Sequence, residues 1–93
     1  MRGSINFYAG EIKEVSAQVR ARNPNEVVVI TEARYQLWNV SAGETAEEGI
    51  LEIDGDTVSV ILGINTPGVF ELKFTVKVGA ETFIEKATVQ VVG

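Results

Sequence analysis

Cysteine and histidine, two residue types that carry much of protein chemistry, are both absent from this chain of 93 residues. Without cysteine the chain forms no disulfide and no thiolate metal site, and it lacks the cysteine pair that crosses the sheets of antibody domains. Without histidine it lacks the side chain best suited to proton transfer near neutral pH and the commonest transition-metal ligand. Histidine-based triads and zinc sites are therefore excluded, and we predict a protein that is not an enzyme and uses no cofactor.

Positive charge is scarce as well, with 8 lysines and arginines against 13 acidic residues and a net charge of −5. Phosphate recognition needs a basic stripe or patch, and no such stripe is visible along the chain. The longest apolar run, at 27–30, is far shorter than the ~18 residues of a membrane-spanning helix. We therefore expect neither nucleic acid nor a membrane among the partners.

Alternation of apolar and polar residues is the dominant pattern that is present, and it is the spacing of a half-buried strand. It is clearest over 70–78, where apolar residues take every even position. A second run covers 15–22 and a third covers 33–37. The third continues from the β-branched stretch 27–31 with a change of phase, which predicts a bulge or a sheet-to-sheet transition near Thr31.

Shorter strands are expected over 50–53 and 57–62, followed by a last strand over about 82–92 with Ala87, Val89 and Val91 facing in. Turn residues separate the strands. A turn at 23–25 closes the early strand, and 66–68 introduces the strand at 70–78.

Two tight turns and one loop complete this outline. Asp54-Gly55-Asp56 predicts a hairpin, because glycine adopts the positive φ that such a turn requires. Gly79-Ala80 turns the strand at 70–78 back. The stretch 39–49, rich in small and acidic residues, is the longest predicted loop.

About six or seven strands, spaced roughly 8–12 residues apart with no helix between them, predict an all-β fold. We expect an immunoglobulin-like β-sandwich of about seven antiparallel strands in two sheets. A sandwich is favoured over a barrel because the connections are uneven in length. Residues 1–93 are expected to form one such domain, which a longer protein can contain.

Three segments carry a family resemblance: 7–13 (FYAGEIK), 33–38 (ARYQLW) and 66–74 (TPGVFELKF). Together they resemble short immunoglobulin-like domains of bacteriophages and prophages, which are similar to modules of tail, baseplate and other virion proteins. In the third segment such domains commonly carry tyrosine where this chain has Phe70, so a tyrosine-corner hydrogen bond is impossible here. The resemblance implies a structural role in a virion or on the host surface, with the bacterial cytoplasm as the location before assembly.

Two acidic groups are candidates for chemistry. Glu52, Asp54 and Asp56 place three carboxylates within five residues, and Ca²⁺ prefers oxygen ligands. Their spacing lacks the longer ligand series of a calcium loop, and the hairpin turn explains Asp-Gly, so we assign no metal site. Glu47 and Glu48, as an acid–base pair, would point to opposite faces of a strand.

The aromatic residues divide by phase into core and surface. Tyr35, Phe70 and Phe74 fall on inward faces and are assigned to the core. Trp38 is out of phase with the inward-facing Leu37 and ends a strand, so we predict that it is partly exposed.

With Asn39 and Glu44 in the loop that follows, Trp38 forms the predicted partner-binding site. The glycosylation pattern at 39–41 is interpreted as a turn. For Phe7 and Tyr8 the sequence leaves two roles open, binding of a partner and packing at a sheet edge.

Two functions are consistent with these features. The first is a non-catalytic structural or assembly module of a phage or prophage virion, with protein partners or self-association. The second is a recognition domain that binds a glycan or protein through loops at one end of the sandwich, around Trp38 and 39–49. The apolar stretch 27–30 is either an edge that pairs with another subunit or a segment buried on both faces.

Overall fold

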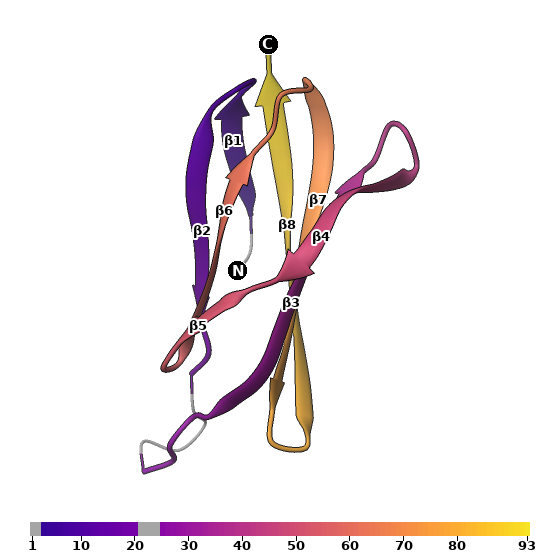
Figure 1. Ribbon diagram of the computed structural model, residues 1–93. Coiled ribbons are helices and arrows are strands. Elements are labelled where there is room, and N and C mark those ends of the chain that lie inside the picture. Colours follow the sequence, from indigo (N-terminus) through magenta and orange to yellow (C-terminus); the bar gives the residue numbers. More distant parts are fainter. Residues whose placement is uncertain (1–2, 21–24) are drawn as a thin grey trace.

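The computed structural model describes residues 3–20 and 25–93, and these residues form strands and no helix. The strands are β1 (Ser4–Tyr8), β2 (Ile12–Gln18), β3 (Ile30–Asn39), β4 (Glu44–Ile50), β5 (Glu52–Asp54), β6 (Thr57–Gly63), β7 (Gly68–Val78) and β8 (Glu81–Val92). Figure 1 shows them as two layers that run along the long axis of the molecule. The all-β, two-sheet prediction is confirmed, with eight strands in place of about seven.

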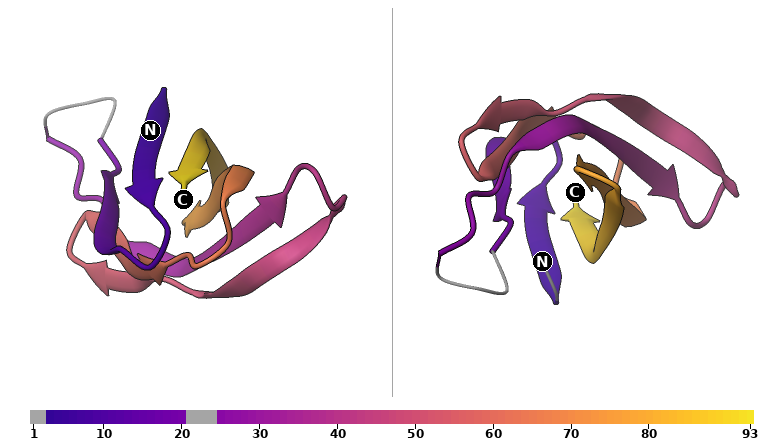
Figure 2. Two further views of the ribbon diagram at one scale, coloured as in Figure 1. Left: turned by 90° about the horizontal axis from the view of Figure 1, so that it is seen from above. Right: turned by 90° about the horizontal axis from the view of Figure 1, so that it is seen from below.

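The strands divide unequally between the two sheets. Sheet A has five strands in the order β1-β8-β7-β3-β4, and sheet B has three in the order β2-β6-β5. All neighbours are antiparallel except β1, which runs parallel to β8. Viewed along the long axis, β1 of sheet A lies between β2 of sheet B and β8 (Figure 2).

The core lies between the sheets and is built from alternate residues of each strand, as the period-two pattern requires. β7 buries Phe70, Leu72, Phe74 and Val76, and β8 buries Ala87, Val89 and Val91 as predicted. Each fully buried large aliphatic or aromatic side chain contributes roughly 1.5–3 kcal/mol relative to its exposed state. The two strands with the clearest alternation therefore supply much of the core.

A bulge interrupts β3 at Thr31, as predicted. Ile30 pairs with Val78 while Glu32 pairs with Lys77, which leaves Thr31 without an opposite residue. The Thr31 hydroxyl donates a hydrogen bond to the carbonyl of Lys77 at 3.3 Å. The phase change read from the sequence therefore corresponds to one extra residue in the ladder.

The stretch before this bulge is not buried on both faces, so that alternative is wrong. β3 begins only at Ile30, and Val27 is 86% exposed. Val28 alone among residues 27–29 packs against the core. Pairing of this stretch with another subunit stays a prediction.

The loop predicted at 39–49 is also wrong, because β4 occupies Glu44–Ile50 and pairs with β3. β4 is the edge strand of sheet A and is exposed on both faces, so its sequence shows no alternation. The pairs Leu37–Glu47 and Trp38–Thr45 leave Ala46 as an extra residue, a second bulge. Only 40–43 forms the turn.

The segment 50–53, predicted as one strand, instead crosses from sheet A to sheet B. β4 ends at Ile50 in sheet A and β5 begins at Glu52 in sheet B. Leu51 between them is buried, and its N–H donates to the carbonyl of Ala33 at 3.0 Å. A buried side chain thus anchors the point where the chain changes layer.

The remaining predictions for strands and turns are mostly confirmed. Gly55 and Gly79 open two-residue hairpin loops with φ of 60° and 59°, which is the backbone conformation that glycine favours there. Strands match 57–62 and 82–92 within one residue at each end. The strand predicted over 15–22 is shifted: β2 begins at Ile12 and ends at Gln18, and residues 21–22 lie outside the described residues. The turn predicted at 23–25 also lies outside the described residues, except for Asn25.

Candidate functional site

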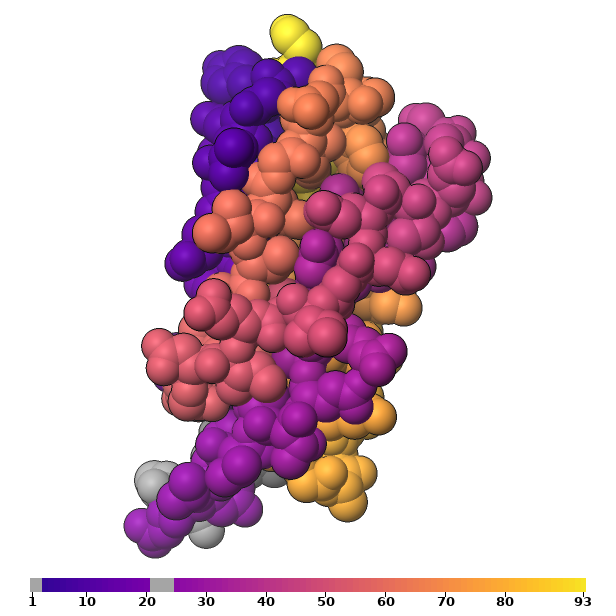
Figure 3. All heavy atoms as spheres, viewed as in Figure 1, coloured from indigo at the N-terminus to yellow at the C-terminus, as the bar shows by residue number. Residues whose placement is uncertain are grey.

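The three residues predicted to bind a partner lie together in the β3–β4 hairpin. Trp38 and Asn39 end β3, Glu44 begins β4, and Asn39 pairs with Glu44. The hairpin stands away from the body of the sandwich, at the upper right of Figures 1 and 3. The site predicted as a loop is therefore a projecting pair of strands.

Asn39 shapes the turn of this hairpin. Its side-chain oxygen accepts a hydrogen bond from the N–H of Ala42 at 3.1 Å, and its carbonyl accepts one from the N–H of Gly43 at 2.9 Å. Gly43 has a φ of 66°, which glycine adopts at low cost. The turn interpretation of 39–41 is confirmed, and the side chain of Asn39 is engaged within the turn.

Trp38 lies on the outer face of sheet A and is 38% exposed. It pairs with Glu71 of β7 and with Thr45 of β4. Val40 donates its N–H to the carbonyl of Val69 at 3.1 Å, which holds these two exposed valines beside each other. We call Trp38, Val40 and Val69 the Trp38 patch.

A shallow groove of about 520 Å³ lies further along the same face, and we call it the outer groove. It lies over β3, β4 and β7, and its lining is mixed in charge. The lining residues are Arg34, Tyr35, Gln36, Glu48, Gly49, Ile50, Lys73 and Thr75.

Ion pairs organise the charges at the far end of this face. Glu32 contacts Arg34 at 2.7 Å and Lys77 at 3.1 Å. A hydrogen bond from Lys77, together with the positive charges of Lys77 and Arg34, lowers the pKa of Glu32. The outer face of sheet A therefore has an apolar end at Trp38 and a charged end at Glu32.

β4 is held against β3 from the inner side by Tyr35. Tyr35 pairs with Gly49, and a Cβ atom at Gly49 would lie 3.1 Å from the ring of Tyr35. Burial and the neighbouring Glu47 carboxylate raise the pKa of the Tyr35 hydroxyl. Tyr35 is half-buried and packs against the core, as its inward phase predicted.

The acidic groups considered in the sequence do not converge. Glu47 lies near Tyr35 on the inner side while Glu48 lines the outer groove, so the two carboxylates face apart. Among the described residues no three acidic side chains gather as a metal site would require. Asp56 accepts a hydrogen bond from Gln18 at 2.9 Å, which lowers its pKa and ties the β5–β6 turn to β2.

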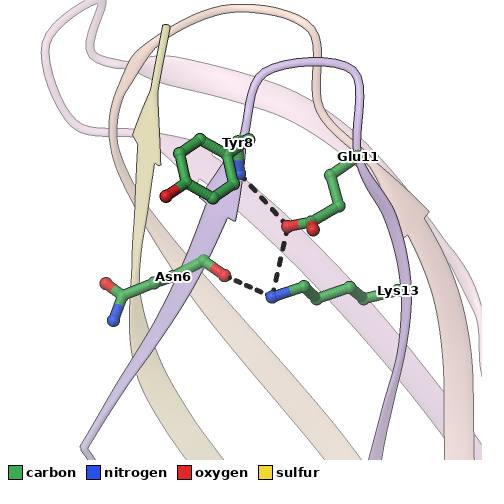
Figure 4. Close-up of polar contacts among 4 residues, drawn as sticks. All are labelled: Asn6, Tyr8, Glu11 and Lys13. Carbon is green, nitrogen blue, oxygen red and sulfur yellow. Dashed lines mark hydrogen bonds and ion pairs between the residues drawn. The ribbon is translucent and has the colours of Figure 1, made fainter.

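A polar cluster that the sequence did not reveal ties β1 of sheet A to β2 of sheet B (Figure 4). Lys13 donates to the carbonyl of Asn6 at 2.7 Å and contacts Glu11 at 3.2 Å. Glu11 in turn accepts a hydrogen bond from the N–H of Tyr8 at 3.2 Å. The ammonium of Lys13 also lies 5.3 Å from the ring centre of Phe7.

Phe7 and Tyr8 have separate roles at this junction. Phe7 is 1% exposed and belongs to the core, while Tyr8 is 69% exposed. Alternation along β1 accounts for the difference, because neighbouring side chains of a strand point to opposite faces. The burial of Phe7 therefore supports its packing role and not a role in binding.

Comparison with known proteins gives structural neighbours only. No family model matches the chain, and no curated protein matches it. CopC from Methylosinus trichosporium OB3b superimposes with a TM-score of 0.66 and 14% identity, over 94% of this chain and 81% of that one. A chain of the titin M10–obscurin-like 1 Ig complex gives a TM-score of 0.52 and 18% identity, over 98% and 86%.

These likenesses decide the architecture. The fold is an immunoglobulin-like β-sandwich. Neither neighbour points to phage or prophage virion proteins, and at these identities the likeness shows the fold alone.

In the nomenclature of the immunoglobulin-like fold, β3, β7 and β8 correspond to strands C, F and G, and β4 adds a strand beside C. The Trp38 patch and the outer groove therefore lie on the face of the larger sheet. The recognition hypothesis placed binding on the loops at one end of the sandwich. Trp38 instead lies within β3, on the outer face of sheet A.

Within residues 3–20 and 25–93, no helix has the length and apolar character that crossing a membrane requires.

Proposed function

We propose that this chain is a non-catalytic binding module that holds a protein partner on the outer face of sheet A. The observation that carries the proposal is the partly exposed Trp38, which lies on the outer face of sheet A with exposed Val69 and with exposed Val40 of the adjoining turn. Tryptophan is enriched among the residues that dominate the energy of protein interfaces. An apolar centre with charged residues around it is the usual composition of such an interface.

The surroundings of the Trp38 patch fit this role. Glu71, which is paired with Trp38, contacts Lys86 at 3.7 Å, and the outer groove adds Arg34, Lys73 and Glu48. Charges of both signs at the rim select a partner with a complementary arrangement. The apolar centre supplies affinity when water leaves it.

The test compares Trp38→Ala with Ile61→Ala, which removes an exposed apolar side chain from sheet B. Each variant is used as bait in cells of the source organism, with cross-linking and mass spectrometry. We expect Trp38→Ala to lose at least about tenfold of the captured partner while Ile61→Ala retains it. Urea unfolding should show a change within about 1 kcal/mol for both variants, because both side chains are partly exposed.

Two outcomes would contradict the proposal. If Trp38→Ala mainly lowers the free energy of unfolding, then Trp38 is a structural residue. If a glycan array retains the wild type and loses Trp38→Ala, the partner is a sugar stacked on the indole ring and not a protein.

A finer form of the proposal is that the module belongs to a phage or prophage particle. Its support is the resemblance of 7–13, 33–38 and 66–74 to immunoglobulin-like virion domains. Mass spectrometry of banded particles induced from the source cells tests it, and stoichiometric presence is expected. Detection of the protein elsewhere in the cells but not in particles would overturn the virion role and leave the binding face to the Trp38 test.

A further inference from the structure

β8 is paired along only half its length on the side away from β7. β1 pairs with the upper half, from Ser4 opposite Thr88 to Tyr8 opposite Val92. In the part of the chain that the structure describes, residues 81–87 of β8 pair with β7 alone. Figure 1 shows β1 beginning halfway along β8, with the lower part of β8 beyond it.

Beside residues 81–87, which β1 does not cover, two adjoining cavities of about 330 and 460 Å³ open between β8 and the end of β2. They share Val19, Arg20 and Phe83, and together we call them the β2–β8 slot. The first cavity reaches core residues, among them Val58, Phe74 and Val76, which are buried. The slot is thus an opening into the hydrophobic core along the part of β8 that β1 does not cover.

The hydrogen-bonding groups of the open edge follow from the pairing above it. The N–H of Thr88 donates to the carbonyl of Gly3, and the carbonyl of Val92 accepts from Ala9, so even-numbered residues of β8 face β1. Alternation along the strand aims the N–H and C=O of Thr82 and Ile84 at the same side. Below β1, no strand of the described residues 3–20 and 25–93 pairs with that side, and we call it the open edge.

The two edges of sheet A differ in their protection against pairing. β4 carries Glu44, Glu47 and Glu48 and a bulge at Ala46, which are devices that keep an edge from adding strands. The lower half of β8 presents Thr82 and Ile84 outward and also carries charges, at Glu81, Glu85 and Lys86, but its register with β7 is unbroken. The difference between the two edges is therefore the bulge. The lower half of β8 is a regular strand edge beside an apolar slot.

We propose that the β2–β8 slot takes an extended strand from a partner polypeptide, which continues the line of β1 and runs parallel to β8. The backbone of Thr82 and Ile84 supplies the pairing, as in other cases of strand addition to a sheet edge. Side chains opposite Phe83 and Glu85 enter the slot, because the inward face of β8 carries these residues.

The chemistry of the partner strand's side chains follows from the residues of the slot that they would contact. Those that enter the slot are apolar, since six of the nine residues that line its first cavity are apolar. Basic residues flank them, because the domain carries a net charge of −5.

The experiment uses the synthetic peptide Lys-Thr-Val-Thr-Val-Thr-Lys and follows backbone amide hydrogen exchange by NMR. We expect the amides of Thr82 and Ile84 to slow by at least about tenfold at saturating peptide, because pairing removes them from water. The amides of Phe83 and Glu85 already face β7 and serve as internal controls. A matched peptide with asparagine in place of valine should leave all four unchanged.

Two variants test the backbone edge and the apolar cavity of the slot separately. Ile84→Pro removes an N–H that faces only the open edge, and proline is tolerated at such positions. We expect it to weaken peptide binding by at least about tenfold with little loss of stability. Ala17→Phe fills the slot and should block the peptide, while Ala42→Phe in the β3–β4 turn should not.

The proposal is overturned if the valine peptide leaves Thr82 and Ile84 unprotected, if the asparagine peptide protects them equally, or if Ile84→Pro binds as the wild type does. Should Ala17→Phe fail to fold, the Ile84→Pro result alone decides. Trp38→Ala is expected to bind the peptide normally, because Trp38 lies on the outer face of sheet A. Failure here and failure of the proposed function are therefore distinguishable.

Discussion

Lys13 connects the two sheets at the level of single residues. From β2 it reaches the carbonyl of Asn6, the carboxylate of Glu11 and the ring of Phe7. Ion pairs at an exposed position stabilise weakly in isolation. Here the ammonium also bonds a backbone carbonyl of β1, so its contribution is to orient β1 against sheet B.

Glu11 gives this cluster a pH dependence. Its pKa is lowered from 4.5, first by the hydrogen bond from the backbone N–H of Tyr8 and then by Lys13. A lowered pKa in the folded state gives stability that is present above pH 4.5 and lost as the pH falls through the folded-state value. This contribution to stability is largest at low ionic strength, because Glu11 is exposed and dissolved salt screens its charge.

We predict that Glu11→Gln lowers the urea midpoint near neutral pH and that the difference from the wild type disappears in acid. Urea unfolding from about pH 7 to about pH 3 measures it. The control Glu14→Gln removes one exposed charge from β2, the strand that begins directly after Glu11, without touching the cluster. Parallel pH profiles for the wild type and Glu11→Gln would contradict the assignment.

At the scale of elements, β7 and β4 show why one strand was predicted and another was missed. β7 buries one face, so its alternation is visible in the sequence. β4 is exposed on both faces and is held by pairing with β3 and by the contact of Tyr35 with Gly49. Hydrophobic pattern reports burial, and a strand without a buried face leaves no such pattern.

The glutamates of β4 are expected to oppose self-association of the protein. We predict that Glu44→Thr combined with Glu48→Thr raises the self-association constant by at least about tenfold, because an edge without charge pairs more readily with another copy. Sedimentation analysis over a range of concentrations measures this. Glu26→Thr combined with Glu71→Thr makes the same change in net charge away from the edge, and association of both pairs to the same extent would contradict the role of β4.

At the scale of the whole molecule, β1 closes one side of the sandwich with a single buried ring. Phe7 is among the largest fully buried side chains, and it comes from a strand of only five residues. Domains of this size have roughly 5–15 kcal/mol of stability. Loss of one large core side chain is therefore a large fraction of the total.

We predict that Phe7→Ala lowers the free energy of unfolding by roughly 3–5 kcal/mol, the range for deletion of a buried aromatic ring. Tyr8→Ala, at the neighbouring exposed position, should change it by at most about 0.5 kcal/mol. Urea unfolding followed by tryptophan fluorescence of Trp38 measures both. Similar losses for the two variants would show that β1 acts through its backbone pairing and not through the ring.

The sequence by itself determined the class of the protein: an all-β sandwich, its long strands, the glycine turns, the bulge at Thr31 and the exposure of Trp38. These features follow from local geometry, since side-chain alternation and positive φ are properties of a few consecutive residues. It also singled out Trp38, Asn39 and Glu44, which the fold brings into one hairpin.

Only the tertiary structure decided the parallel pairing of β1 with β8, the edge strand β4 and the β2–β8 slot. Each depends on which distant segments lie side by side. That choice is made by burial across the whole core, because no short segment carries enough apolar surface to select its own neighbour.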